Sequence, residues 1–102
     1  MNTMTEWQVG EIVETCMNAL GYPAELEMGG GGSPEIFLPL WEMEYGPRLH
    51  YATYAYEGIG IETWAGDDTW EESPDFPRLE IDRSKPITRQ VNAYLSELAN
   101  YF

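Results

Sequence analysis

Near the amino end of the chain, apolar residues recur every three or four positions, as they do on one face of an α-helix. The residues on this face are Val9, Ile12, Val13, Cys16, Met17 and Leu20. A capping box is available at the start, formed by Thr5 with Gln8 or by Thr3 with Glu6. Gly21 ends the pattern, because glycine readily adopts the left-handed conformation that follows a last helical turn. The spacing predicts a helix over residues 5–20.

A second apolar stripe with helical spacing lies at the carboxyl end. Its residues are Ile87, Val91, Tyr94, Leu95, Leu98 and Phe102. Pro86 stands just before them, and proline is favoured in the first turn of a helix. This stripe predicts a closing helix, amphipathic like the first one.

Between the two helical patterns the chain changes to the alternation of antiparallel strands. The expected strands cover residues 24–28, 35–45 with a bend near Pro39, 49–56, 59–64 and 78–82. A tight hairpin is expected at Glu57 and Gly58, and Gly60 marks a bulge or a close neighbour. The whole pattern predicts an α+β fold in one domain, residues 1–102. Its antiparallel sheet has four to five strands, and both helices cover one face of it.

One glycine-rich segment and one acidic segment could each bind a ligand instead of serving only as a connection. Gly29–Gly32 are four consecutive glycines, but no lysine follows and no helix opens after them, so a hairpin tip is favoured over a phosphate-binding loop. Residues 66–77 carry five acids around Trp70 and are interpreted as a solvated loop. Calcium is the alternative ligand there, but the alternating ligands of an EF-hand are missing. We therefore expect no metal and no cofactor.

The net charge of the chain indicates more about its partners than its overall composition does. The chain has 18 acids and 5 bases, a net charge of -13. Arg48 is the only base among residues 1–77, which hold fifteen acids and so carry -14, whereas residues 78–102 carry +1. So negative a protein is repelled by nucleic-acid phosphates and by anionic lipid, which argues against direct binding to nucleic acid or membrane. Cys16 is the only cysteine, which suits a reducing, cytoplasmic compartment.

Catalytic chemistry has few candidate residues. His50 is the only histidine and is expected to be a surface or half-buried strand residue without a partner. Cys16 lies on the apolar face of the first helix, as a core thiol does. A glycosidase-like pair of carboxylates is formally available among so many acids, but no cleft is indicated. We therefore expect a protein that is not an enzyme.

Aromatic residues interleaved with acids are the more specific signal. Tyr and Trp provide contact area at interfaces, and acids around them select a basic partner. The expected partner-binding residues are Glu42, Glu44, Glu57, Glu62, Asp67, Asp68, Glu71 and Glu72, with Trp64 and Trp70 as anchors. In size, charge and domain class the chain resembles small acidic inhibitors that mimic nucleic acid, such as phage anti-CRISPR and anti-restriction proteins.

That resemblance implies a non-enzymatic inhibitor whose partner is a basic, nucleic-acid-binding protein. The chain is similar in the same way to immunity proteins that neutralise nuclease toxins. An acidic secretion or assembly chaperone, which would hold an apolar segment on its sheet, is the alternative from a different class.

Overall fold

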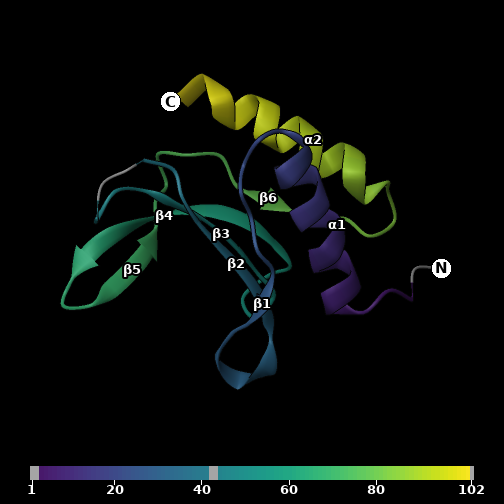
Figure 1. Ribbon diagram of the computed structural model, residues 1–102, viewed down its shortest axis with the longest axis horizontal. Coiled ribbons are helices and arrows are strands. Elements are labelled where there is room, and N and C mark those ends of the chain that lie inside the picture. Colours follow the sequence, from purple (N-terminus) through teal and green to yellow (C-terminus); the bar gives the residue numbers. More distant parts are fainter. Residues whose placement is uncertain (1–2, 42–43, 102) are drawn as a thin grey trace.

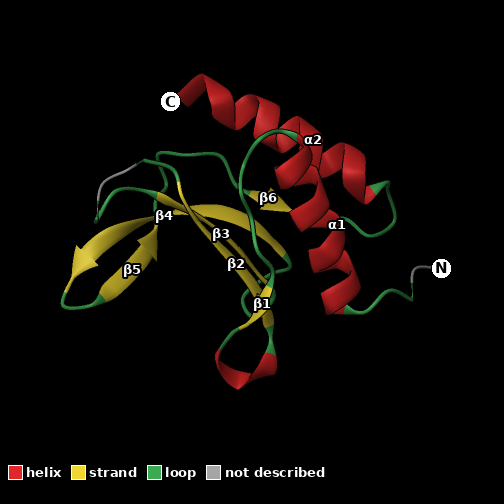
Figure 2. Cartoon of the chain, viewed as in Figure 1, coloured by secondary structure: helices red, strands yellow, loops and turns green. Residues whose placement is uncertain are grey.

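Two helices lie over one face of an antiparallel sheet (Figures 1 and 2). The computed structural model describes residues 3–41 and 44–101. In chain order the elements are α1 (Glu6–Ala19), β1 (Glu27–Met28), the 3-10 turn η1 (Gly30–Gly32), β2 (Pro34–Pro39), β3 (Arg48–Ala52), β4 (Gly58–Gly66), β5 (Thr69–Glu72), β6 (Leu79–Glu80), α2 (Ile87–Leu98) and the 3-10 turn η2 (Ala99–Tyr101). The predicted α+β fold, with a helix at each end of the chain and both helices on one face, is confirmed.

The sheet follows the chain, with strand order β1-β2-β3-β4-β5 and every pairing antiparallel. Strand β4 is the longest, and its two halves have different neighbours on one side. Its first residues pair with β6, where Gly58 lies opposite Glu80. Its later residues pair with β5, where Glu62 lies opposite Glu72. The β4–β5 hairpin therefore extends away from the helices as an arm (Figure 1).

The hydrophobic core lies between the helices and the inner face of the sheet. Alternate residues of β2, β3 and β4 point into it, among them Leu49 and Tyr51, each 0% exposed. The core residues of the two helices are Val9, Val13, Cys16, Met17, Ile87, Val91, Tyr94, Leu95 and Leu98. Helix α1 packs against both α2 and β2. One contiguous cluster thus closes the fold.

Both ends of the first helix are formed as predicted, but fewer of its apolar residues are buried than the sequence suggests. Of the two capping boxes, the one formed by Thr5 and Gln8 is present, with both of its hydrogen bonds. Gly21 has φ 90°, the left-handed conformation expected of it. Ile12 is only partly buried at the rim of the core, and Leu20 is 52% exposed. Leu20 caps the helix and lies beyond its last turn, so the prediction that it is buried is wrong.

Four of the five predicted strands are shorter in the structure. The strands expected over residues 24–28 and 78–82 are reduced to Glu27–Met28 and Leu79–Glu80. The strand expected over residues 35–45 ends at Pro39, and its register continues for one more hydrogen bond, in which the Leu40 amide donates to the Pro47 carbonyl at 3.0 Å. The strand expected over residues 49–56 ends at Ala52. Proline cannot donate to a ladder, so Pro47 cannot return a hydrogen bond to Leu40, and β2 ends at Pro39, where a bend was expected.

The prediction of a solvated loop over residues 66–77 is wrong for its first half. Asp67 and Asp68 have φ values of 51° and 59°, which is the double left-handed conformation of a two-residue hairpin turn. Strand β5 follows at once and pairs with β4 through Trp70 opposite Trp64. Aspartate tolerates the left-handed conformation better than most residues, which allows this turn without glycine.

Two glycines of β4 mark a close approach. A Cβ atom on Gly58 would lie 1.9 Å from the Leu79 carbonyl oxygen, and one on Gly60 would lie 2.8 Å from a Glu72 carboxylate oxygen. The register is continuous at Gly60, and the irregularity of β4 falls between Trp64 and Gly66 instead. Of the two expectations for Gly60, the close neighbour is the one that holds.

Candidate partner-binding face

The sheet face turned away from the helices carries polar and aromatic side chains, and we call it the open face. Its members follow from strand alternation and register. They are Glu35 and Phe37 on β2, Arg48 and His50 on β3, Glu62 and Trp64 on β4, and Trp70 and Glu72 on β5. Neither helix covers this face, although Glu35 and His50 are buried by their neighbours on it.

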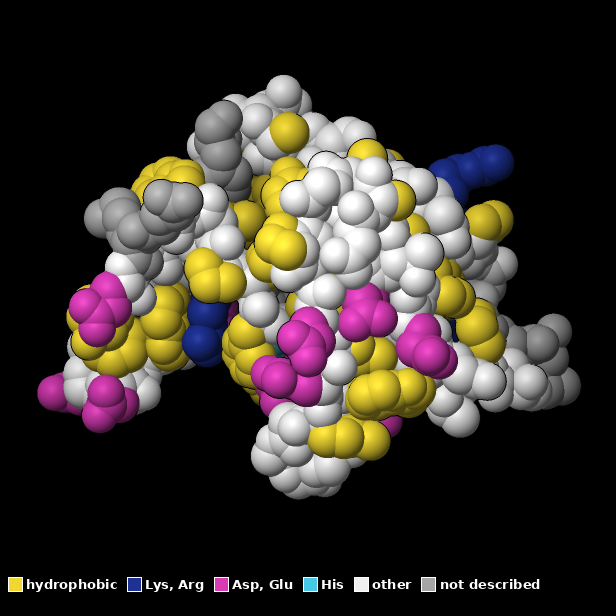
Figure 3. Space-filling model, viewed as in Figure 1, with side chains coloured by type: hydrophobic (Ala, Val, Ile, Leu, Met, Phe, Trp, Pro, Cys, Tyr) yellow, Lys and Arg dark blue, Asp and Glu magenta, His cyan; other side chains and the backbone are white. Residues whose placement is uncertain are grey.

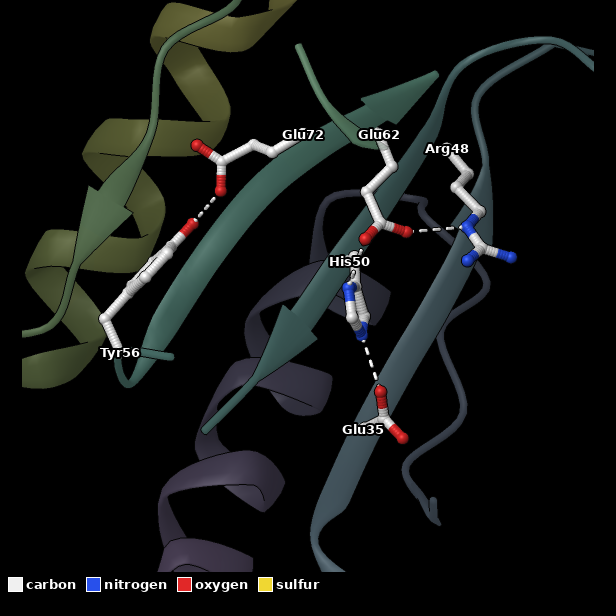
Figure 4. A network of polar contacts seen from close by, with 6 residues as sticks. All are labelled: Glu35, Arg48, His50, Tyr56, Glu62 and Glu72. Atoms are coloured by element: carbon white, nitrogen blue, oxygen red, sulfur yellow. Dashed lines mark hydrogen bonds and ion pairs between the residues drawn. The ribbon is translucent and has the colours of Figure 1, made fainter. Parts of the chain in front are cut away.

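His50 lies at the centre of the open face and is bound by a carboxylate on each side (Figure 4). Its Nε2 is 2.7 Å from Glu35 Oε2, and its Nδ1 is 3.0 Å from Glu62 Oε2. The other oxygen of Glu62 accepts from Arg48 Nε at 2.9 Å. Phe37 stacks on the imidazole with ring centroids 4.3 Å apart, and His50 is only 7% exposed. The expectation of a surface or half-buried histidine without a partner is therefore wrong.

The electrostatics of this network favour a charged imidazole. Burial by itself lowers the pKa of His50, but the hydrogen bonds and negative charges of Glu62 and Glu35 outweigh it and raise that pKa above its usual value. For Glu62, burial raises the pKa, yet the contacts with His50 and Arg48 prevail and lower it. With both ring nitrogens facing carboxylates, the imidazolium donates on both sides. The network is a structural ion chain that joins β2, β3 and β4.

A second polar cluster lies across β4 from the first (Figure 4). The Tyr56 hydroxyl donates to Glu72 Oε1 at 2.5 Å, and the Arg78 guanidinium lies 3.7 Å above the Tyr56 ring. Burial first, and then the hydrogen bond to Glu72, raises the pKa of Tyr56 well above its usual range. A hollow of about 180 Å³ lies along Gly58 and Gly60 between the two clusters. Because the two glycines lack side chains, the side chains of Tyr56 and Glu72 can lie close over this strip of the sheet.

Aromatic side chains surround Arg48 on the same face. The Arg48 guanidinium lies 4.4 Å from the centroid of Phe37 and 4.0 Å from that of Trp70. Trp64 meets Trp70 edge to face at 5.4 Å, and Tyr45 packs on Trp64 at 4.6 Å. Trp70 is thus held by an internal cation and a neighbouring indole, whereas the sequence suggested an indole left on a solvated loop.

The acids predicted to bind a partner fall into two groups. Glu57 and Glu62 are engaged inside the protein. The Arg83 guanidinium donates two hydrogen bonds to the Glu57 carboxylate, from Nε at 2.8 Å and from Nη2 at 2.7 Å. The Glu57 side chain is 16% exposed. Glu62 belongs to the His50 network, and Glu72 accepts from Tyr56.

The second group of predicted acids lies at the surface. Asp67 and Asp68 form the tip of the β4–β5 hairpin, and Glu71 points to the opposite side of β5 from Trp70 and Glu72. Glu44 is exposed at one end of the open face, and Glu42 lies outside the described residues. The structure brings Trp64, Trp70, Glu62 and Glu72 together. It leaves the hairpin tip apart from them.

Sequence reasoning missed Glu35, Arg48 and His50 as a unit. Alternation puts Arg48 and His50 on one face of β3, which is a signal that could have joined them. The carboxylates that bind His50 come from β2 and β4, and no local pattern points to them.

The single thiol and the single imidazole of the chain lie on opposite faces of the sheet. Cys16 is buried in the core on the helix side, where burial raises its pKa, while His50 is on the open face, so the two cannot form a catalytic pair. In the described ranges, no group of three or more His, Cys, Asp or Glu side chains is arranged to hold a metal ion. None of the described helices combines the length and the apolarity needed to cross a membrane.

Comparison with protein-family models, with curated proteins and with solved structures finds no match for this chain.

Proposed function

We propose that this protein is a non-enzymatic inhibitor that binds a basic, nucleic-acid-handling protein, in the manner of small acidic nucleic-acid mimics. The observation that carries the proposal is an asymmetry in how the charges are used. Four of the five bases form ion pairs within the protein, whereas many acids at the surface form none in the described residues.

The ion pairs of the bases are specific. Arg48 pairs with Glu62, Arg83 with Glu57, and Lys85 with Asp82, while Arg78 lies near both Glu72 and Glu80. Because these contacts neutralise the cations locally, the field outside the protein is dominated by the remaining carboxylates.

Most of the acids without an ion pair are exposed. Within residues 3–41 and 44–101 they include Glu25, Glu27, Glu44, Asp67, Asp68 and Glu71. Acidic side chains gather at the β4–β5 arm and in the region of α1 and β1 (Figure 3). Spaced carboxylates of this kind accelerate association with a basic surface and compete with phosphates for it.

Exposed aromatics near these acids provide contact area. Tyr54 is 67% exposed, Tyr45 54% and Trp41 45%. Such side chains also favour the second candidate, an acidic chaperone that holds an apolar segment. The two functions differ in salt dependence, because ion pairs are screened by salt and apolar burial is not. An immunity protein would use the same contacts and would differ in having a toxin as its partner.

The test is competition with nucleic acid. The tagged protein is used to capture its partner from cells that carry its gene, and the purified partner is then mixed with labelled DNA or RNA. We expect the protein to displace the nucleic acid, and we expect its affinity for the partner to fall steeply between low and high salt. A partner that binds no nucleic acid, or that binds nucleic acid and this protein together, would contradict the proposal. Binding that survives high salt would favour the chaperone.

A further inference from the structure

A groove crosses one end of the open face, and two adjoining hollows form it. One hollow, of about 480 Å³, is lined by Phe37, Pro39 and Trp41 together with Glu25 and Glu27. The other, of about 510 Å³, shares Phe37, Pro39 and Trp41 and continues to Arg48, Trp70 and Glu44. We call the two together the acidic groove. Figure 3 shows this part of the molecule as a recess between the β4–β5 arm and the rest, with a basic side chain among apolar ones.

The walls of the groove carry negative charge that the protein does not neutralise. Glu25 and Glu27 stand on the β1 side and Glu44 at the opposite end, all three exposed and without an ion pair in the described part of the chain. Arg48, the one cation that lines it, is paired with Glu62. The groove therefore presents a net negative surface to whatever enters it.

The floor of the groove already holds one guanidinium between aromatic rings. Arg48 lies 4.4 Å from Phe37 and 4.0 Å from Trp70, the distances of cation–π contacts. Trp41 is 45% exposed along the same groove, so the exposed part of its indole is accessible to a second guanidinium. Arginine suits such a place better than lysine, because its planar group stacks on a ring while its N–H groups bond carboxylates.

We infer that the acidic groove is the docking site for an extended, arginine-bearing segment of the partner protein, with an arginine stacked on Trp41 and bonded to the wall carboxylates. This inference rests on the proposed function and adds the surface and the contacting residue type. On this inference, Asp67 and Asp68 at the hairpin tip attract the basic partner over a distance but do not contact the arginine-bearing segment.

The test uses a short synthetic peptide of arginines separated by glycines, which needs no knowledge of the partner. Its control peptide has citrulline in place of each arginine, with nearly the same shape and no charge. Titration into the full-length protein is followed by tryptophan fluorescence and calorimetry. We expect saturable binding of the arginine peptide and none of the citrulline peptide.

Two pairs of matched variants separate the groove from general attraction. Glu25→Gln with Glu27→Gln removes two charges from the wall of the groove and should lower the affinity for the arginine peptide about tenfold. Asp67→Asn with Asp68→Asn removes two charges at the tip, where asparagine also tolerates the left-handed conformation, and should change the affinity less than about twofold. Trp41→Ala should weaken binding about tenfold, whereas Trp7→Ala, which removes an exposed indole from α1, should not.

Equal losses for the wall and tip variants, or no loss for Trp41→Ala, would overturn the inference and leave only diffuse attraction. The peptide result is independent of the competition experiment above. If the groove binds the arginine peptide but the captured partner does not bind nucleic acid, the proposed function is refuted and the groove is not. If the protein displaces nucleic acid from its partner but the groove does not bind the arginine peptide, the inference about the groove is refuted and the proposed function is not.

Discussion

At the residue scale, His50 is where the structure departs most from what its sequence suggests. A lone histidine on a strand is usually a surface residue, yet here it is buried between the carboxylates of Glu35 and Glu62, which raise its pKa and so favour the charged form. Two carboxylates so close to one another repel unless a positive charge separates them. The imidazolium therefore contributes to stability only together with its neighbours, and the effect depends on pH.

The pH dependence follows from the two shifted pKa values. The pKa of His50 is raised above 6.5, so its stabilisation is complete below pH 6.5 and is lost as pH rises through the folded value. The pKa of Glu62 is lowered below 4.5, so its stabilisation is complete above pH 4.5 and is lost as pH falls. The free energy that the network contributes is thus largest between these two values.

We predict that His50→Gln lowers the free energy of unfolding by about 2 kcal/mol within that pH window and by less on either side of it. Urea unfolding of both proteins over a pH series measures the difference. Arg89→Gln is the control, because it removes one positive charge from an exposed position of α2. A difference that does not vary with pH, or that Arg89→Gln reproduces, would contradict a charged, clamped imidazole.

The sequence predicts contacts between residues that are near one another along the chain, but not contacts between residues that are far apart. Period-two alternation predicts that the aromatic residues between positions 35 and 64, and the acids among them, lie on strands, but it does not say which strands are neighbours. Glu35 and Glu62 reach His50 from 15 and 12 residues away, and Glu57 meets Arg83 26 residues later. These contacts exist only once the sheet and its connections have formed.

At the scale of elements, the helices were predictable because their signals are local. Val9, Val13 and Met17 lie one turn apart, and Gly21 marks the end within the same segment. Strand ends depend on a partner strand, and so the boundaries near Pro39 and Ala52 were wrong. The β4–β5 hairpin escaped notice because Asp-Asp is a weaker turn signal than Asn-Gly.

That hairpin gives the second prediction. Asp67→Asn with Asp68→Gly should raise the free energy of unfolding by about 1 kcal/mol, since both residues have positive φ and the pair favours this turn. Thermal and urea unfolding measure the gain. Asp75→Asn, which removes a charge from the following segment without touching the turn, is the control. A gain no larger than that of Asp75→Asn would mean that relief of charge, not turn geometry, is responsible.

At the scale of the whole molecule, the excess of acids opposes folding. Eighteen acids against 5 bases give a net charge of -13, and the ion pairs of Arg48, Arg78, Arg83 and Lys85 relieve it only locally. The compact state brings the remaining carboxylates closer together than the unfolded chain does. Screening should therefore favour the folded protein.

We predict that raising the salt concentration from low to physiological values raises the melting temperature by about 5 °C, because screening reduces the repulsion by an energy of the order of 1 kcal/mol. Scanning calorimetry in sodium and in potassium chloride separates screening from ion-specific effects. Over the same range, affinity for the arginine peptide should fall. A melting temperature that stays constant or decreases would show that internal ion pairs, which salt weakens, outweigh the repulsion.

The strand order has a consequence for how the chain folds. Every strand from β1 to β5 lies beside its neighbour in sequence, so these pairings close short loops and can form early. The packing of α1 on α2 joins the two ends of the chain and has to wait for the longest closure. Until α2 docks, the inner face with Ile36 and Leu49 is only partly covered. During that interval the like charges keep half-folded copies apart, so the acidity also protects the chain from aggregation while it folds.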